Sequence, residues 1–114
     1  MMSDDLARIQ QELRTFAQER DWERYHTPRN LAALISSEAG ELLALFRWDQ
    51  DSLVERPDEV RQELADVFLG VLRLADVAGI DLIESAEEKL KLNAEKYPPK
   101  ADSGPDAMAP AQNR

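Results

Sequence analysis

Two pairs of carboxylates with the same three-residue spacing are the feature of this sequence that most clearly suggests chemistry. Glu38 and Glu41 form an E-x-x-E pair, and Glu63 and Asp66 form an E-x-x-D pair. Residues three apart lie on one face of an α-helix, so each pair presents two carboxylates side by side. On a wheel of about 100° per residue, Glu38 falls in the middle of an apolar stripe and Glu63 falls beside a second one.

Carboxylates on an apolar helix face need a compensating partner, because a bare carboxylate in a protein core is strongly destabilising. The options are protonation, pairing with Lys or Arg, and a hard divalent cation shared by several carboxylates. Ordinary charge at a helix edge would explain one such pair. Two pairs on neighbouring helices favour a metal site, with Glu38, Glu41, Glu63 and Asp66 as ligands. Oxygen ligands favour Mg²⁺ or Mn²⁺ over Zn²⁺.

A complementary polar set occurs near the end of the chain. Lys89, Asn93 and Tyr97 follow one another at four-residue spacing and therefore share a helix face. Lys89 either neutralises an inward acid or holds an anionic group such as a phosphate. The combination of Mg²⁺ with a lysine suggests phosphate chemistry.

Aromatic and basic residues concentrate in the segment 22–30, just before the first acidic pair. One interpretation is a hydrophobic staple with solvated charges. The other is a nucleotide site, in which Trp22, together with Trp48 further along the chain, stacks on a base. Arg29 and Asn30 would then contact phosphates at a helix N-terminus.

Helices must position these residues, because apolar side chains recur with the helical period and alternating β-branched runs are absent. The sequence predicts an all-α fold. The first helix is expected to begin with Ser3 as N-cap and to end near Arg20. Its expected buried residues are Leu6, Ile9, Leu13 and Phe16.

Three further helices follow from capping and proline signals. Thr27 and Pro28 begin a helix that runs to about Phe46. After a polar connection over 49–56, Pro57 begins another, which continues to about Ala78 before Gly79. The last helix is expected to follow the capping pair Asp81 and Glu84 and to end before Pro98.

The length of 114 residues predicts one domain, over 1–97, followed by a proline-rich tail over 98–114 that we expect to be disordered. The absence of cysteine excludes disulfides, thiolate metal sites and a cysteine nucleophile. A net charge of −9 disfavours nucleic acid and anionic membranes as partners. No signal-peptide pattern and no long apolar stretch is present, so we expect a cytoplasmic protein.

The two acidic pairs, followed by Lys89, Asn93 and Tyr97, resemble the all-α nucleoside triphosphate pyrophosphohydrolases of the MazG-like superfamily. The runs DWERYHTPRN, EAGELLALFRW and KLKLNAEKYP are most similar to its dCTP pyrophosphatase branch. The resemblance covers roughly residues 6–98.

This resemblance implies an antiparallel arrangement like a four-helix bundle, assembled as a homodimer or a dimer of dimers. It implies hydrolysis of (deoxy)nucleoside triphosphates to a monophosphate and pyrophosphate, as housekeeping of the nucleotide pool. The four acidic positions would hold Mg²⁺. Lys89, Asn93 and Tyr97 would lie near the phosphates, and Trp22 and Trp48 near the base.

Two positions depart from the dCTP-preferring branch. A histidine on its first helix and a tyrosine one turn after the aspartate of E-x-x-D form part of its base pocket, and here these positions hold Leu13 and Gly70. The base preference therefore stays open. For catalysis, we expect Glu38 to orient or deprotonate the attacking water and Lys89 to stabilise the developing charge.

Two other classes of protein also place acids between helices. A di-iron carboxylate bundle needs two E-x-x-H motifs, but the chain has a single histidine, His26, in a Glu23-x-x-His26 pair just before Pro28. The second alternative is a non-catalytic helical interaction module whose inward acids form salt bridges with a partner. Metal-dependent and nucleotide-dependent stabilisation would distinguish the enzyme from this module.

Overall fold

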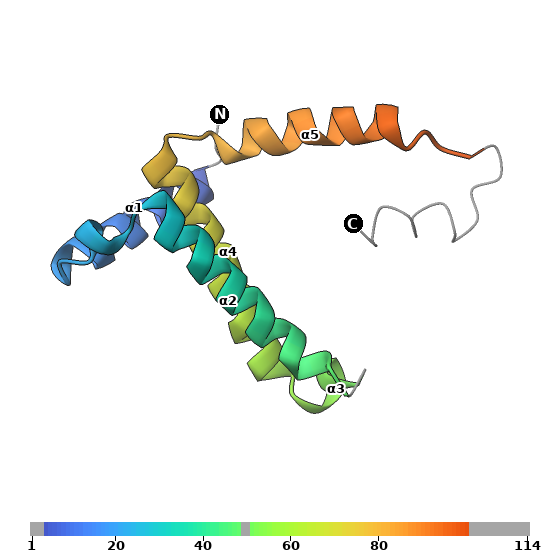
Figure 1. Cartoon of the computed structure of the whole chain (residues 1–114), viewed down its shortest axis with the longest axis horizontal. Helices are drawn as coiled ribbons and strands as arrows, with labels where there is room; N and C mark the ends of the chain where they lie inside the picture. The colour runs from blue at the N-terminus through green and yellow to red at the C-terminus, as the bar shows by residue number, and fades with distance from the viewer. Residues whose placement is uncertain (1–3, 49–50, 101–114) are drawn as a thin grey trace. The chain divides into compact units, whose positions relative to one another are not determined.

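The computed structural model describes residues 4–48 and 51–100. Within these ranges the chain is all-α, as the sequence predicts (Figure 1). The elements are α1 (Asp4–Glu19), the 3₁₀ turn η1 (Glu23–Tyr25), α2 (Pro28–Phe46), α3 (Ser52–Glu55), α4 (Pro57–Ala78) and α5 (Leu82–Lys96). The expected N-cap Ser3 and the tail from residue 101 onward lie outside the described residues.

The predicted boundaries of α2, α4 and α5 are confirmed, and α1 ends at Glu19, next to the expected Arg20. The side chain of Thr27 accepts a hydrogen bond from the Asn30 N–H at 3.2 Å, and Pro28 occupies the first turn of α2. Helix α4 begins at Pro57 and ends at Gly79, whose φ of 68° is left-handed. One element was not predicted, since the expected polar connection contains the single-turn helix α3.

The chain divides into two compact units. Of the described residues, 4–48 and 51–82 form the first unit, which holds α1 to α4, and 83–100 form the second, which holds nearly all of α5. In the first unit, α2 and α4 lie side by side and antiparallel, with α3 between them in the chain (Figure 1). Helix α1 also packs on α4.

Helix α1 ends in a left-handed cap formed without glycine. Asp21 has a φ of 55°, its N–H donates to the Gln18 carbonyl at 3.2 Å, and the Trp22 N–H donates to the Ala17 carbonyl at 2.9 Å. These two bonds are those of a Schellman motif. They tie the backbone of Trp22 to the last turn of α1.

The expected burial on α1 is wrong. Gln10 and Ala17 are its buried residues, Phe16 is 44% exposed, and Leu6, Ile9 and Leu13 are only half-buried. The helix is turned so that the Gln10 side chain faces α4, where its amide donates to the Leu72 carbonyl at 3.4 Å. The ring of Phe16 is instead covered by Arg20, whose guanidinium carbon lies 3.5 Å from the ring centre.

The core of the first unit is small, and large apolar side chains remain at the surface. Its buried apolar residues are Ala17 on α1, Leu31 on α2, and Val60, Leu72 and Ala75 on α4. The stripe that contains Glu38 is only partly covered. The exposed apolar residues of α2, α3 and α4 are Leu34, Leu43, Leu53, Val54, Leu64, Phe68 and Val77. In the described ranges, no helix combines the length and apolar character needed to span a membrane.

Candidate functional site

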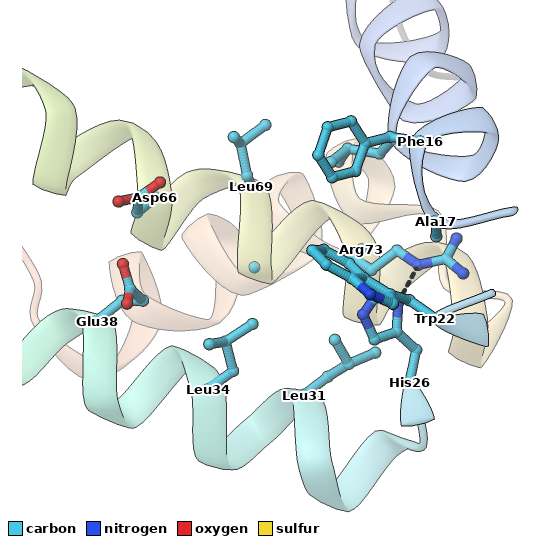
Figure 2. Close-up of a pocket in the computed structure, with 12 residues that line it drawn as sticks. Phe16, Ala17, Trp22, His26, Leu31, Leu34, Glu38, Asp66, Leu69 and Arg73 are labelled. Carbon is cyan, nitrogen blue, oxygen red and sulfur yellow. Dashed lines mark hydrogen bonds between the residues drawn. The ribbon is translucent and has the colours of Figure 1, made fainter. Parts of the chain in front are cut away.

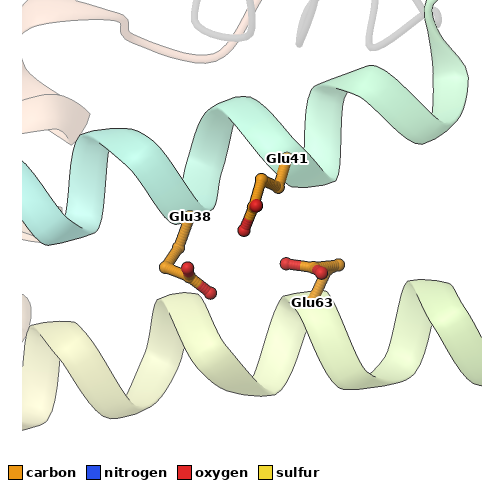
Figure 3. Close-up of side chains that lie close together, drawn as sticks. All are labelled: Glu38, Glu41 and Glu63. Atoms are coloured by element: carbon orange, nitrogen blue, oxygen red, sulfur yellow. The ribbon is translucent and has the colours of Figure 1, made fainter.

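The antiparallel packing of α2 on α4 brings three carboxylates together. Glu38 and Glu41 on α2 face Glu63 on α4 (Figure 3). One carboxylate oxygen from each residue lies within 4.8 Å of the other two. The expected fourth acid, Asp66, is outside this group of three. It lines an adjoining cavity, together with Glu38.

The electrostatics of this cluster show uncompensated negative charge. Partial burial raises the pKa of Glu38 to about 7, with further contributions from the hydrogen bond and charge of Glu41 and then of Asp66. Burial also raises the pKa of Glu63, and the charges of Glu41 and Asp66 add to that effect. Carboxylates held this close favour protonation or a shared cation.

One oxygen in the cluster has no partner of its own. Oε2 of Glu63 is buried and accepts no hydrogen bond from any described residue. A buried acceptor without a donor is costly, and a cation would satisfy it. The donor set consists of carboxylate oxygens only, so these residues fit Mg²⁺ or Mn²⁺ better than a softer metal.

A cavity of about 300 Å³ begins at this cluster and extends between α1, α2 and α4. Figure 2 shows Glu38 and Asp66 at one end and Trp22, His26 and Arg73 at the other. The wall between the two ends is apolar. The cavity is large enough for one small ligand, at the lower end of the usual range of about 300–1,000 Å³.

The two positions that depart from the dCTP-type pattern, Leu13 and Gly70, both line this cavity. A Cβ atom on Gly70 would lie 3.1 Å from Cγ1 of Ile35, so α2 and α4 approach closely there. Any side chain at this position would therefore press against Ile35.

The two tryptophans differ in position. Trp22 lines the cavity and packs edge to face against Phe16, with 5.6 Å between the ring centres, and against His26 at 6.3 Å. Trp48 is 91% exposed and is not part of the cavity wall. The sequence suggested both for base stacking, and the structure brings only Trp22 to the cavity.

Arg29 and Asn30 lie at the start of α2 and are exposed. The side-chain amide of Asn30 donates to the Tyr25 carbonyl at 3.0 Å, so it already contributes to the local structure before α2. Neither residue lines the cavity. Their expected contacts with phosphates stay predictions.

Comparison with known proteins identifies the family. The sequence pattern of the MazG-like family matches residues 33–106. The chain belongs to the MazG-like family. The matched range includes all four acidic positions, whereas Trp22 and His26 precede it.

Curated relatives of this MazG-like chain are named dCTP pyrophosphatase 1. The rat protein is 36% identical over 102 residues and the human protein 37% over 103 residues, each across 83% of this chain. The chain spans 58% of the length of these relatives. A solved structure described as a pyrophosphatase, from Archaeoglobus fulgidus, is 39% identical with a TM-score of 0.80. That match covers 86% of this chain and 96% of the archaeal one.

Helix α5 of the MazG-like chain carries the remaining expected residues. Lys89 is exposed, and Asn93 and Tyr97 are half-buried. The Tyr97 N–H donates to the Asn93 carbonyl at 2.7 Å, which continues the helical pattern past Lys96. Since α5 belongs to the second unit, the roles of these residues at the phosphates stay predictions.

Sequence reasoning assigned no site role to Arg14, Arg73 and Asp76 and considered His26 only for a di-iron site. The structure links these four residues around the far end of the cavity. A signal for Arg73 was present in the sequence. It follows Asp66 by two helical turns and therefore shares its face. The pairing of Arg14 with Asp76 joins α1 to α4, which are far apart in the sequence, and no local pattern predicts it.

Proposed function

We propose that this MazG-like protein hydrolyses nucleoside triphosphates, dCTP or related and modified deoxynucleotides in particular, to a monophosphate and pyrophosphate. The observation that carries the proposal is the convergence of three carboxylates at the mouth of an aromatic-lined cavity. The names of the dCTP pyrophosphatase relatives and of the archaeal pyrophosphatase support it.

Mg²⁺ is the proposed cofactor, and Mn²⁺ is an acceptable replacement. A chain with a net charge of −9 repels a triphosphate unless a cation intervenes. Glu38, Glu41 and Glu63 would hold the ion, with Asp66 beside them. When bound, the ion supplies positive charge that offsets the charge of the phosphates.

Glu38 is the proposed catalytic residue, because it belongs to the three-carboxylate group and also lines the cavity. Its carboxylate would orient the attacking water and accept its proton as the bond to phosphorus forms. The pyrophosphate group then leaves with the bonding electron pair. On α5, Lys89 would stabilise the developing charge, and Asn93 and Tyr97 would contact the phosphates.

The base would occupy the cavity, with Trp22 at its wall. Aromatic rings at such a position stack on bases with little dependence on sequence, so Trp22 contributes affinity rather than selectivity. Trp48, Arg29 and Asn30 would contribute contacts outside the cavity.

A homodimer or homotetramer is the proposed assembly. Leu64 and Phe68 are exposed and lie with Val67 around a shallow apolar hollow on α4. Apolar surface of this kind on one chain is typical of an interface. A second copy of the chain would cover it.

The decisive test is the release of pyrophosphate and orthophosphate from a panel of common and modified nucleoside triphosphates with Mg²⁺. We expect pyrophosphate from a subset of the panel, and its loss in Glu41→Gln and Asp66→Asn. Glu12→Gln, on an exposed residue paired with Arg8, is the matched control and should leave the rate unchanged.

No release from any nucleotide would overturn the proposal and favour the non-catalytic interaction module. The melting temperature gives an independent criterion. Stabilisation that needs both Mg²⁺ and nucleotide, and disappears in EDTA, fits the enzyme and not the module.

A further inference from the structure

A buried arginine stands at the end of the cavity away from the carboxylates. Arg73 is 6% exposed, and two of its nitrogens are engaged. Its Nη1 donates to Oδ2 of Asp76 at 3.2 Å, and its Nε donates to Nδ1 of His26 at 3.0 Å. Figure 2 shows the second bond as a dashed line.

Arg14 holds this group in place from α1. Its Nε and Nη2 donate to the two carboxylate oxygens of Asp76, at 3.0 and 2.7 Å. Asp76 lies in the last turn of α4, where the helix dipole disfavours an anion. The two arginines compensate for this, and the shared carboxylate fixes the orientation of the Arg73 guanidinium.

The bond to Arg73 also determines the state of His26. A guanidinium only donates hydrogen bonds, so Nδ1 must be the acceptor and the neutral ring carries its proton on Nε2. Partial burial lowers the pKa of His26, and the charge of Arg73 lowers it further against a smaller opposing effect of Glu23. His26 is therefore a neutral N–H donor at pH 7.

One donor at this end of the cavity is left for a ligand. Among the described residues, nothing accepts from Nε2 of His26, which lines the cavity. Its neighbours in the wall include Leu13, Phe16 and Leu31, which offer no side-chain acceptor. A donor in such surroundings favours a ligand that brings its own acceptor.

We propose that His26, oriented by Arg73, selects the base of the nucleotide by donating from Nε2 to a carbonyl oxygen on its edge. This inference rests on the proposed function, which puts the phosphates at the carboxylate end and the base at the other. Cytosine, guanine, thymine and uracil carry such an oxygen. Adenine carries an amino group and no carbonyl oxygen, so the Nε2–H would face another donor.

Hypoxanthine and adenine provide a matched pair of probes. They have the same ring system, and a carbonyl in hypoxanthine replaces the amino group of adenine. We expect the wild-type protein to prefer dITP over dATP by about 2- to 10-fold in kcat/KM, which is the value of one neutral hydrogen bond. In Arg73→Met this preference should fall toward unity, mainly through KM.

His26→Phe is the second variant, because it removes the Nε2 donor and leaves the pair of Arg14 with Asp76 intact. It should also reduce the preference, and thermal unfolding checks that both variants are folded. Arg8→Met, on an exposed arginine of α1 that does not line the cavity, is the control and should retain the wild-type preference. Equal loss of rate for dITP and dATP in Arg73→Met would overturn the inference and leave the proposed hydrolysis standing.

Calorimetric titration with deoxyinosine and deoxyadenosine in EDTA separates the two proposals, because nucleosides carry no phosphate and need no metal. Tighter binding of deoxyinosine, lost in Arg73→Met, would support the inference even if no triphosphate were hydrolysed. Equal affinity for the two nucleosides in the wild type would overturn it.

Discussion

Glu38 on α2 faces Glu63 on α4, with a carboxylate oxygen of each within 4.8 Å of the other. The same interface that buries Leu31 and Leu72 therefore brings like charges together. Without a cation this arrangement opposes folding, and with a cation it becomes a binding site. The effect of this charge on thermal stability can be measured without substrate.

The metal-free protein should lose stability as the pH rises between about 4.5 and 7. The pKa of Glu38 is raised to about 7 in the folded state from an ordinary value of 4.5, so the folded state holds this proton more tightly than the unfolded state. Deprotonation across this window therefore destabilises the fold. In EDTA, the melting temperature of Glu38→Gln should exceed that of the wild type by a margin that grows from pH 5 to pH 8. A constant margin would contradict the assigned pKa.

Mg²⁺ should restore the stability that the metal-free protein loses as the pH rises. A ligand that binds only the folded state at 100 times its Kd adds about 2.7 kcal/mol to the free energy of unfolding. For a domain of this size that corresponds to a rise in melting temperature of roughly 10 °C. Glu63→Gln should remove most of the rise, since Glu63 supplies the buried oxygen without a partner. The exposed-site control Glu12→Gln should retain it, and an equal rise in Glu63→Gln would show that the ion binds elsewhere.

Glu38→Gln should reduce turnover much more than it weakens substrate binding. General-base contributions are typically about 100- to 10,000-fold, so we expect kcat to fall by at least about 100-fold. Steady-state pyrophosphate release at saturating Mg²⁺ provides the measurement. A variant that retains most of the wild-type rate would remove Glu38 from its catalytic role and leave it as a metal ligand.

The apolar hollow on α4 should control assembly. Light scattering of the wild-type protein is expected to give the mass of a dimer or tetramer. Phe68→Asp places a charge on the exposed apolar face and should shift the population to smaller species. Thr15→Asp, at an exposed position of α1, is the control. A monomeric wild type would contradict the proposed assembly.

The sequence was sufficient for features that depend on local spacing. Thr27 with Pro28 and Gly79 predicted where α2 begins and where α4 ends, because caps act within one turn. The three-residue spacing of the acids predicted that each pair would share one helix face, and the structure brings Glu38, Glu41 and Glu63 together across α2 and α4. The rotation of α1 was not predictable in this way, since the amide of Gln10 finds its acceptor at Leu72, far along the chain.

The polar end of the cavity was missed for the same reason. Arg73 and Asp76 interrupt an apolar run and were visible as charges, but their meaning depends on Arg14, which is 62 residues from Asp76. A helical wheel describes one helix at a time. This end of the cavity arises where α1 meets α4, and only the packed structure shows it.

Asp76→Ala should be the most destabilising substitution of a charged residue in the first unit. It leaves Arg73 buried without its carboxylate, and removing one partner of a buried ion pair costs about 3–5 kcal/mol. Because the side chain of Arg14 is 39% exposed, solvent offsets part of this effect, and we expect about 2–3 kcal/mol in urea unfolding.

Glu12→Ala, which breaks the exposed pair with Arg8, should cost less than about 0.5 kcal/mol in the same assay. Equal effects of Asp76→Ala and Glu12→Ala would mean that the Asp76 carboxylate does not anchor Arg73. The preference for dITP over dATP should also change more in Asp76→Ala than in Glu12→Ala. Without Asp76, the Arg73 guanidinium loses its fixed orientation. Asp76→Ala is therefore expected to lower the ratio of dITP to dATP hydrolysis, whereas Glu12→Ala leaves it unchanged.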